Sequence, residues 1–233
     1  MAASVPDRTC VPDGKGGIMF RKAGENWVRR PYFEYYMNKI RCRYNVNYEL
    51  DVTDMVRRIR KAGLRFYPSM LYVVSRGVNM NPEFRMSLDA DGEPGFWDEI
   101  NPSYTIFHDD DKTFSDIWSE YDPRFSVFYA RVVEDMTRYR DVKGISAKPG
   151  RPENCCPMTS APWLSFSAYS NDTYSESQML FPIITFARFF ERDGVIRLPF
   201  SVFVHHAAAD GYHTCKLIND IQALLLELSW LEC

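Results

Sequence analysis

Apolar and polar residues alternate, or recur at helical spacing, along most of the chain, and the two patterns predict different elements. Period-two alternation over 42–50 predicts a strand with one buried face. Apolar residues three and four positions apart predict a helix over 29–40 and a final helix over 210–230. The same reasoning predicts further strands at 85–88, 104–108, 163–169, 182–191 and 195–206, and further helices over 52–59, 68–80 and 114–139.

Strands and helices are interspersed without a repeat or a linker, so the pattern predicts one α/β domain with a mixed β-sheet flanked by helices. Two segments lack regular patterning. Residues 1–25 are polar and contain glycine, and we expect a flexible N-terminal tail before a domain over 26–233. Residues 143–162 contain three proline turns without periodicity, which indicates a functional loop because long irregular loops are uncommon without a reason.

Composition narrows the class of protein. Of the 233 residues, 45% are apolar and 25% are charged, which indicates a globular chain. The net charge of -3, without a basic patch, argues against a nucleic-acid partner. The sequence has no 18-residue apolar window and no apolar N-terminal stretch, so we expect neither a membrane span nor a signal peptide. Six cysteines without a CxxC pair predict free thiols in a reducing, cytoplasmic compartment.

The chemistry-bearing residues concentrate where the strand over 195–206 passes into the final helix. His205 and His206 are neighbours on that strand, so their side chains point to opposite faces, which argues against a two-histidine metal centre. A neutral imidazole accepts a proton near neutral pH, and Asp210 stands where a helix N-cap is expected. From spacing alone, a buried structural histidine with a capping aspartate is favoured over a general base with an anchoring carboxylate.

The segment HHAAADGYH at 205–213 resembles the HHxxxDG signature of the chloramphenicol acetyltransferase family, part of the wider class of CoA-dependent acyltransferases. Further matching segments stand in family order between about 26 and 226, among them NWVRRPYFEYY (26–36), RFYPSMLYVV (65–74), PSYTIFH (102–108), SAPWLSF (160–166) and FPIITFARFF (181–190). The resemblance implies an acyltransferase fold over 26–233, assembled as a homotrimer with active sites at the subunit interfaces. It also implies acetyl-CoA as co-substrate and no metal.

The resemblance assigns roles to five residues. His206, the second histidine of the pair, would act as general base on an acceptor hydroxyl. Thr159 stands where the family has a serine that donates to the oxyanion, and Ser160 takes that place if the register is shifted by one. Thr185 would hold a water near the intermediate. Asp210 would pair with Arg29 and so hold the histidine loop.

The resemblance also maps a substrate pocket. The acceptor would be lined by aromatic or apolar residues at Tyr36, Ile40, Cys42, Tyr44 and Phe114. Asn171 and Thr173 replace the usual leucine and valine, and Ser146 stands in the irregular loop where a bulky apolar residue is common. These changes make the pocket more polar. On the CoA side, Arg188 would meet a phosphate and Phe189 would pack on the adenine.

The expected function is acetyl-CoA-dependent O-acetylation of chloramphenicol, which inactivates the antibiotic. Two alternatives stay open. The first is a related enzyme that acetylates a different hydroxyl acceptor, which the more polar pocket favours. The second is a non-catalytic trimer that binds hydrophobic ligands in the same pocket.

Overall fold

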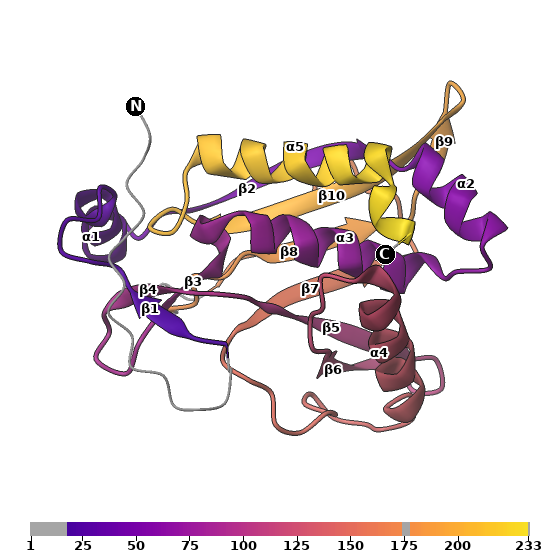
Figure 1. Cartoon of the computed structure of the whole chain (residues 1–233), viewed down its shortest axis with the longest axis horizontal. Helices are drawn as coiled ribbons and strands as arrows, with labels where there is room; N and C mark the ends of the chain where they lie inside the picture. The colour runs from indigo at the N-terminus through magenta and orange to yellow at the C-terminus, as the bar shows by residue number, and fades with distance from the viewer. Residues whose placement is uncertain (1–17, 174–177, 233) are drawn as a thin grey trace.

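A mixed seven-stranded sheet forms the body of the part of the chain that the structure describes (Figure 1). The structure is a computed structural model, which describes residues 18–173 and 178–232. From one edge to the other, the strands are β2 (Arg43–Asp51), β10 (Val195–His205), β8 (Ile183–Ala187), β7 (Cys155–Ala161), β5 (Asn101–His108) and β6 (Thr113–Trp118), and β9 (Phe190–Arg192) pairs with β10 beside this path. β7 runs parallel to β5 and β8, and the other pairs are antiparallel. The predicted mixed sheet is therefore confirmed.

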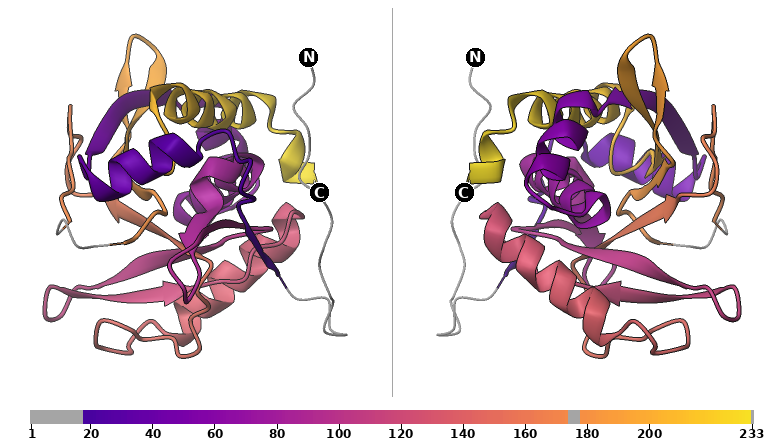
Figure 2. Two further views of the ribbon diagram at one scale, coloured as in Figure 1. Left: turned by 90° about the vertical axis from the view of Figure 1, so that its left-hand side faces the viewer. Right: turned by 90° about the vertical axis from the view of Figure 1, so that its right-hand side faces the viewer.

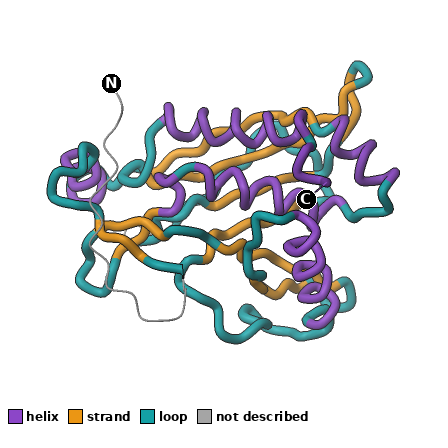
Figure 3. Tube along the Cα trace, in the orientation of Figure 1, coloured by secondary structure: helices purple, strands orange, loops and turns teal. Residues whose placement is uncertain are grey.

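Two long helices, α3 (Phe66–Met80) and α5 (Gly211–Glu227), lie side by side over one face of this sheet (Figures 1 and 3). Gly77 allows them to approach closely, because a Cβ added there would lie 2.5 Å from Cγ1 of Ile221. Two further helices flank them, α2 (Thr53–Lys61) and α4 (Phe125–Arg138). The strand residues beneath are large, apolar and fully buried, among them Tyr104, Met158, Ile184, Phe186, Val202 and Val204.

The alternate positions of the central strands point to the other face of the sheet, since successive strand residues alternate sides. Thr159 on β7 is in register with Thr185 on β8, which is in register with Ser201 on β10. Tyr104 lies opposite Met158, so Thr105 is the β5 neighbour of Thr159. Four hydroxyl side chains therefore form a row across the face that α3 and α5 do not cover.

A small three-stranded sheet stands apart from the large one within the described residues, in the order β1 (Phe20–Lys22), β4 (Pro94–Trp97) and β3 (Met86–Leu88). β1 corrects the predicted tail over 1–25: residues 20–22 pair with β4, where Phe20 packs edge-on against Trp97. Residues 1–17 lie outside the described part. Helix α1 (Arg30–Asn38) follows β1, and short 3-10 helices span Pro82–Arg85 and Ser229–Glu232.

Two other predictions along the middle of the chain were wrong. Residues 113–118 form strand β6 against β5, so the helix predicted over 114–139 is limited to Phe125–Arg138. The strand predicted over 163–169 is a loop, and the strand lies just before it, as β7, inside the segment expected to be irregular throughout. The irregular part runs over 139–154 along the lower edge of the molecule in Figure 3.

β10 carries the chain from one end of the large sheet to the other. Its first residues pair with β9 in a hairpin, which projects from the body of the molecule (Figure 2). Its last residue, His205, pairs with Arg43 at the start of β2, and α5 begins six residues later. The strand end, the turn over 206–210 and the helix start therefore lie together. Searched over the described residues, the chain contains no helix with the length and apolar character of a membrane span.

Candidate active site

His206 follows β10 directly, and two tyrosine rings hold its imidazole. Tyr36 of α1 stacks on the ring at a centroid distance of 3.9 Å and an interplanar angle of 9°. Tyr44 of β2 meets it edge-on at 5.1 Å. The backbone N–H of His206 donates to the carbonyl of Cys42 at 3.0 Å, and Nδ1 is buried without a hydrogen-bond partner among the described residues. Stacking and the backbone bond fix the ring while the residue stays half-exposed.

His205 has a different environment, as the alternation of the strand predicted. Its side chain is buried, and Nδ1 accepts the backbone N–H of Ala207 at 3.2 Å. Burial, with the nearby charges of Arg43 and His206, lowers the pKa of His205 to about 4. A neutral ring that supports the turn is a structural histidine. Of the two histidines, only His206 therefore offers a ring to a substrate.

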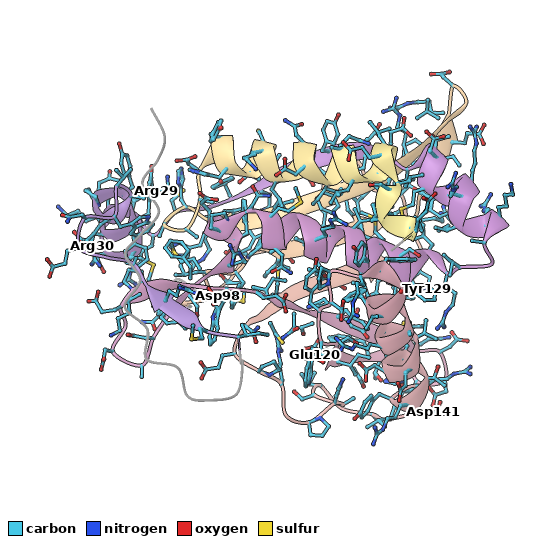
Figure 4. The ribbon with its side chains drawn as sticks, in the orientation of Figure 1. Arg29, Arg30, Asp98, Glu120, Tyr129 and Asp141 are labelled. Carbon is cyan, nitrogen blue, oxygen red and sulfur yellow. The ribbon has the colours of Figure 1, made fainter. Side chains whose placement is uncertain are left out.

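An ion pair fixes the turn after His206. Nη1 of Arg29, just before α1, lies 2.5 Å from Oδ2 of Asp210 at the N-cap of α5, and only 12% of the Arg29 side chain is exposed. Figure 4 labels Arg29 at the end of the molecule where β10 passes into α5. Burial alone raises the pKa of Asp210, but the Arg29 hydrogen bond and the charges of Arg29 and His213 lower it overall. The predicted Arg29–Asp210 contact is present.

Tyr44 connects β2 to the same turn. Its hydroxyl donates to the carbonyl of Ala209 at 3.2 Å and lies 2.7 Å from Oγ1 of Thr214. Burial raises the pKa of Tyr44 to about 12, so the hydroxyl stays protonated. Tyr44 was predicted as a pocket residue, and its hydroxyl is engaged inside the chain. Its ring is the part of the side chain that packs against His206.

The second group of predicted residues lies at the other end of the sheet, around a pocket of about 660 Å³. The carboxyl ends of the parallel strands β5, β7 and β8 open into it. Four of the predicted residues line this pocket: Phe114, Thr159, Arg188 and Phe189. Arg188 is exposed, and the ring of Phe189 packs on Phe66 at 5.0 Å. An apolar pocket with an exposed guanidinium and an aromatic ring fits a thioester co-substrate that carries phosphate and adenine.

Thr159 and Thr185 stand in the row of hydroxyls described above. Oγ1 of Thr159 is half-buried at the pocket wall and lies 3.2 Å from Oγ1 of Thr105. Thr185 is buried, and its Oγ1 has no partner among the described residues. A buried hydroxyl without a partner is the kind of group that an ordered water satisfies. Ser160 also lines the pocket, so the alternative register stays available.

The remaining predicted acceptor residues are spread around these two places. Ile40 is exposed and Cys42 half-buried beside His206. Asn171 and Thr173 belong to a loop beside β2, where Oγ of Ser170 accepts from Asn45 at 2.8 Å. Nδ2 of Asn171 is buried and unpaired within the described residues. Ser146 pairs with Asp116 beside β6.

The structure does not bring the two groups together within one chain. Thr159 is in register with Ser201 through Thr185, and His206 lies five residues further along β10. At roughly 3.3 Å per strand residue and 4.8 Å per strand, His206 and Thr159 are about 19 Å apart. A base and an oxyanion donor at that distance cannot serve one carbonyl, since both must reach it within hydrogen-bond distance. One copy of the chain therefore holds the two predicted half-sites at separate places.

Comparison with known proteins decides the family. The family model of chloramphenicol acetyltransferase matches residues 22–222. The chain belongs to the chloramphenicol acetyltransferase family. A chloramphenicol acetyltransferase of Clostridium perfringens is 42% identical over 200 residues, which cover 86% of this chain and 91% of the relative. One of Clostridium butyricum is 38% identical over 208 residues, covering 89% and 95%. The resemblance inferred from the sequence is confirmed, and with it the class of acyltransferases.

Solved structures agree on the fold. A chloramphenicol acetyltransferase structure has a TM-score of 0.79 at 22% identity, covering 89% of this chain and all of that one. A dihydrolipoamide acetyltransferase of Azotobacter vinelandii has a TM-score of 0.65 at 14% identity, covering 98% of this chain. At these identities the likeness concerns the fold alone. It confirms the predicted fold of the CoA-dependent acyltransferases.

Sequence reasoning left some residues of this family member without a role. His213 lies within 2.6 Å of Oδ1 of Asp210 through Nδ1, and its Nε2 lies 3.6 Å from Glu83. His213 is the third residue of α5, the position from which a capping box reaches back to the N-cap, and this spacing could have identified it. Thr105 of β5 and Tyr67 of α3 also line the pocket, and although both stand in segments that match the family, neither was given a role, because only the tertiary packing brings them there.

The sequence predicts free thiols, and the family resemblance implies no metal. Cys42, Cys155, Cys156 and Cys215 are all free, and Cys10 and Cys233 lie outside the described residues. Burial raises the pKa of Cys155 to about 11, so this thiol stays protonated. Over the described part of the chain, no group of three histidine, cysteine or carboxylate side chains could hold a metal ion.

Proposed function

We propose that the protein transfers the acetyl group of acetyl-CoA to the primary hydroxyl of chloramphenicol, in the cytoplasm, and so confers resistance to the antibiotic. The observation that carries the proposal is the half-exposed His206 ring, stacked on Tyr36 and backed by the Arg29–Asp210 pair. The named relatives at 42% and 38% identity support chloramphenicol as the acceptor.

His206 acts as the general base in this proposal. Its imidazole takes the proton of the acceptor hydroxyl while the hydroxyl oxygen attacks the thioester carbonyl carbon. The Thr159 hydroxyl donates a hydrogen bond to the oxyanion of the tetrahedral intermediate, and Thr185 holds a water nearby. The intermediate collapses by breaking the C–S bond, and the CoA thiolate receives the proton from the imidazolium. No acyl-enzyme forms, so no nucleophilic serine or cysteine takes part.

The two half-sites combine between copies of the chain. We place His206 of one copy against the pocket of a neighbour that carries Thr159, in a homotrimer. The separation of about 19 Å within one chain supports this arrangement. Apolar side chains exposed around His206 also support it: Val28, Tyr32, Tyr35, Ile40 and Tyr212 are each exposed by 45% or more. Such a patch marks a contact surface.

The first test is product formation from acetyl-CoA and chloramphenicol, read by mass spectrometry. We expect a monoacetylated product, which His206→Ala should form at least about 10²-fold more slowly. Mass spectrometry is preferable to a thiol reagent, because six cysteines give a background. Hydrolysis of acetyl-CoA without acetylated chloramphenicol would contradict chloramphenicol as the acceptor, while the proposed acyltransferase chemistry would stand. Binding of chloramphenicol without turnover would favour the non-catalytic trimer instead.

A complementation experiment tests the shared site. Light scattering should give about 82 kDa, three times the 27.2 kDa chain. His206→Ala and Thr159→Val should each keep at most about a hundredth of the wild-type rate alone. When the two variants are refolded together, about a quarter of the interfaces pair an intact His206 with an intact Thr159, so we expect about a quarter of the wild-type rate. A mixture as inactive as its parts would place the site inside one chain, and a monomer mass would remove the shared site altogether.

A different hydroxyl acceptor is the second candidate. The buried, unpaired Nδ2 of Asn171 favours it, since a polar acceptor could satisfy this donor. A panel of hydroxyl compounds in the same assay compares the wild type with Asn171→Leu. A switch of preference towards chloramphenicol in the variant would favour a natural acceptor that is more polar. An unchanged ranking would remove this candidate.

A further inference from the structure

Thr105 places a second hydroxyl beside the proposed oxyanion donor. β5 and β7 are parallel, with Tyr104 opposite Met158, so Thr105 and Thr159 are neighbours on the same face. Their Oγ1 atoms lie 3.2 Å apart, within hydrogen-bond distance. Both residues are half-buried and line the same pocket. No other hydroxyl side chain in the described residues is within hydrogen-bond distance of the Thr159 hydroxyl.

The backbone of Thr105 is held from two sides. β5 lies inside the large sheet, between β6 and β7. The Thr105 carbonyl also accepts a hydrogen bond from the Tyr67 hydroxyl of α3 at 3.4 Å. The Tyr67 ring packs against Tyr104 and Phe186 in the core. Thr105 therefore presents its hydroxyl from a fixed position, as a group that orients another residue must.

The chemistry decides the direction of the bond between the two threonines. A hydroxyl has one proton to donate and two lone pairs that accept. When the Thr159 hydroxyl donates to an oxyanion, it has no second proton for Thr105, so the bond between them holds only if Thr105 donates. A hydroxyl that accepts one hydrogen bond becomes a stronger donor in the next.

A threonine at position 159 needs such a partner more than a serine would. Its Cβ carries a methyl group as well as the hydroxyl, so each χ1 rotamer exchanges the place of the two. In the wrong rotamer the methyl group points to the reacting carbonyl. The hydrogen bond to Thr105 favours one χ1 rotamer of Thr159 over those that exchange the hydroxyl and the methyl group.

We infer that Thr105 is a positioning residue for catalysis: its hydroxyl donates to Oγ1 of Thr159 and aims the Thr159 O–H at the oxyanion. The inference rests on the proposed function and adds a residue to the same site. It concerns the chemical step, so it predicts a change in kcat and little change in KM for either substrate.

The test uses variants that differ only at the hydroxyl. Thr105→Val replaces the hydroxyl by a methyl group of similar size, and we expect kcat to fall about five- to tenfold with both KM values within twofold of wild type. Thr105→Ser restores the hydroxyl and should return kcat to within about twofold of wild type. Ser103→Ala is the matched control on the same strand and face: it bonds to Asp116 instead, and its kcat should not change.

A double-mutant cycle separates positioning from other roles. In a Thr159→Val background, Thr105→Val should cause no further loss, because the hydroxyl that it positions is already absent. An equal loss in both backgrounds, or a wild-type kcat for Thr105→Val, would overturn the inference. So would Thr105→Ser that is as slow as Thr105→Val. If Thr105→Val does not fold, Thr105→Ala, which has a smaller side chain, should show the same fall in kcat.

The outcomes distinguish this inference from the proposed function. A wild-type protein without acetyltransferase activity, or an active Thr159→Val, contradicts the proposed site itself. A wild-type protein that acetylates its acceptor and depends on Thr159, but not on Thr105, contradicts the positioning role alone.

Discussion

Replacing His206 by alanine should lower the rate of acetyl transfer by roughly 10²–10⁴-fold, the range that a lost general base costs. The physical reason is that the acceptor hydroxyl must lose its proton as it attacks, and no other imidazole packs against Tyr36 or Tyr44 in the described structure. The loss should fall on kcat, with the KM for acetyl-CoA little changed. Steady-state kinetics at saturating acetyl-CoA measures it.

Chemical rescue distinguishes a lost base from a damaged fold. The alanine variant leaves a space between two tyrosine rings that fits a free imidazole, so added imidazole should restore part of the rate in proportion to its concentration. His205→Asn is the matched control at the neighbouring position. Because the His205 ring is buried and neutral, we expect a lower Tm but a specific activity within a few-fold of wild type. Full activity of His206→Ala would falsify the assignment of the base.

Asp210→Asn should lower both stability and activity by breaking the ion pair with Arg29. Arg29 is largely buried and Asp210 about one-third exposed, so the cost should lie between the roughly 1 kcal/mol of an exposed pair and the roughly 3–5 kcal/mol of a buried one. The loosened turn carries His206, so we also expect activity per folded protein to fall. Thermal unfolding and steady-state kinetics on the same samples give the two effects separately.

The pH dependence of Asp210 follows from its lowered pKa. The carboxylate is more acidic in the folded chain than in the unfolded chain, so its stabilising contribution is complete above the unfolded value of about 3.9. It is lost as the pH falls through the folded pKa. The Tm of Asp210→Asn should therefore depend less on pH in this acidic range than the Tm of wild type. A cycle with Arg29→Met isolates the pair, and a coupling energy near zero would contradict its structural role.

The sequence predicted the site best where strand and helix signals meet within a few residues. The strand over 195–206, the turn and the capping Asp210 are all contiguous, so local chemistry specifies them. The long apolar helices and the strand at 85–88 were also recognised. These elements depend on neighbours close in the sequence, which is the information that a pattern contains.

The errors concern elements that distant residues determine. Phe114, Ile117 and Trp118 have helical spacing, and only pairing with β5 makes the segment a strand. Pro157 inside β7 disrupted the strand pattern there, because proline is unusual in a central strand. Conversely, the alternation over 163–169 is not a strand signal: Trp163 and Leu164 are each exposed by about 60%.

The contacts between site residues could not be predicted from local patterns, for the same reason. The Arg29–Asp210 pair came from the family resemblance, since 181 positions separate its members. The Thr105–Thr159 contact depends on a parallel register that no local pattern contains. The stacking of Tyr36 on His206 likewise depends on how α1 packs against the end of β10.

The proposed pairing of His206 and Thr159 from two chains also determines how activity depends on the concentration of the protein. A site that needs two chains exists only in the associated protein, and its abundance falls faster than the total on dilution. At low protein concentration, the rate of acetylation should therefore rise more steeply than in proportion to the amount of protein. In a cell, the tolerated concentration of antibiotic would then respond to gene dosage with a threshold, below which weak expression gives almost no protection.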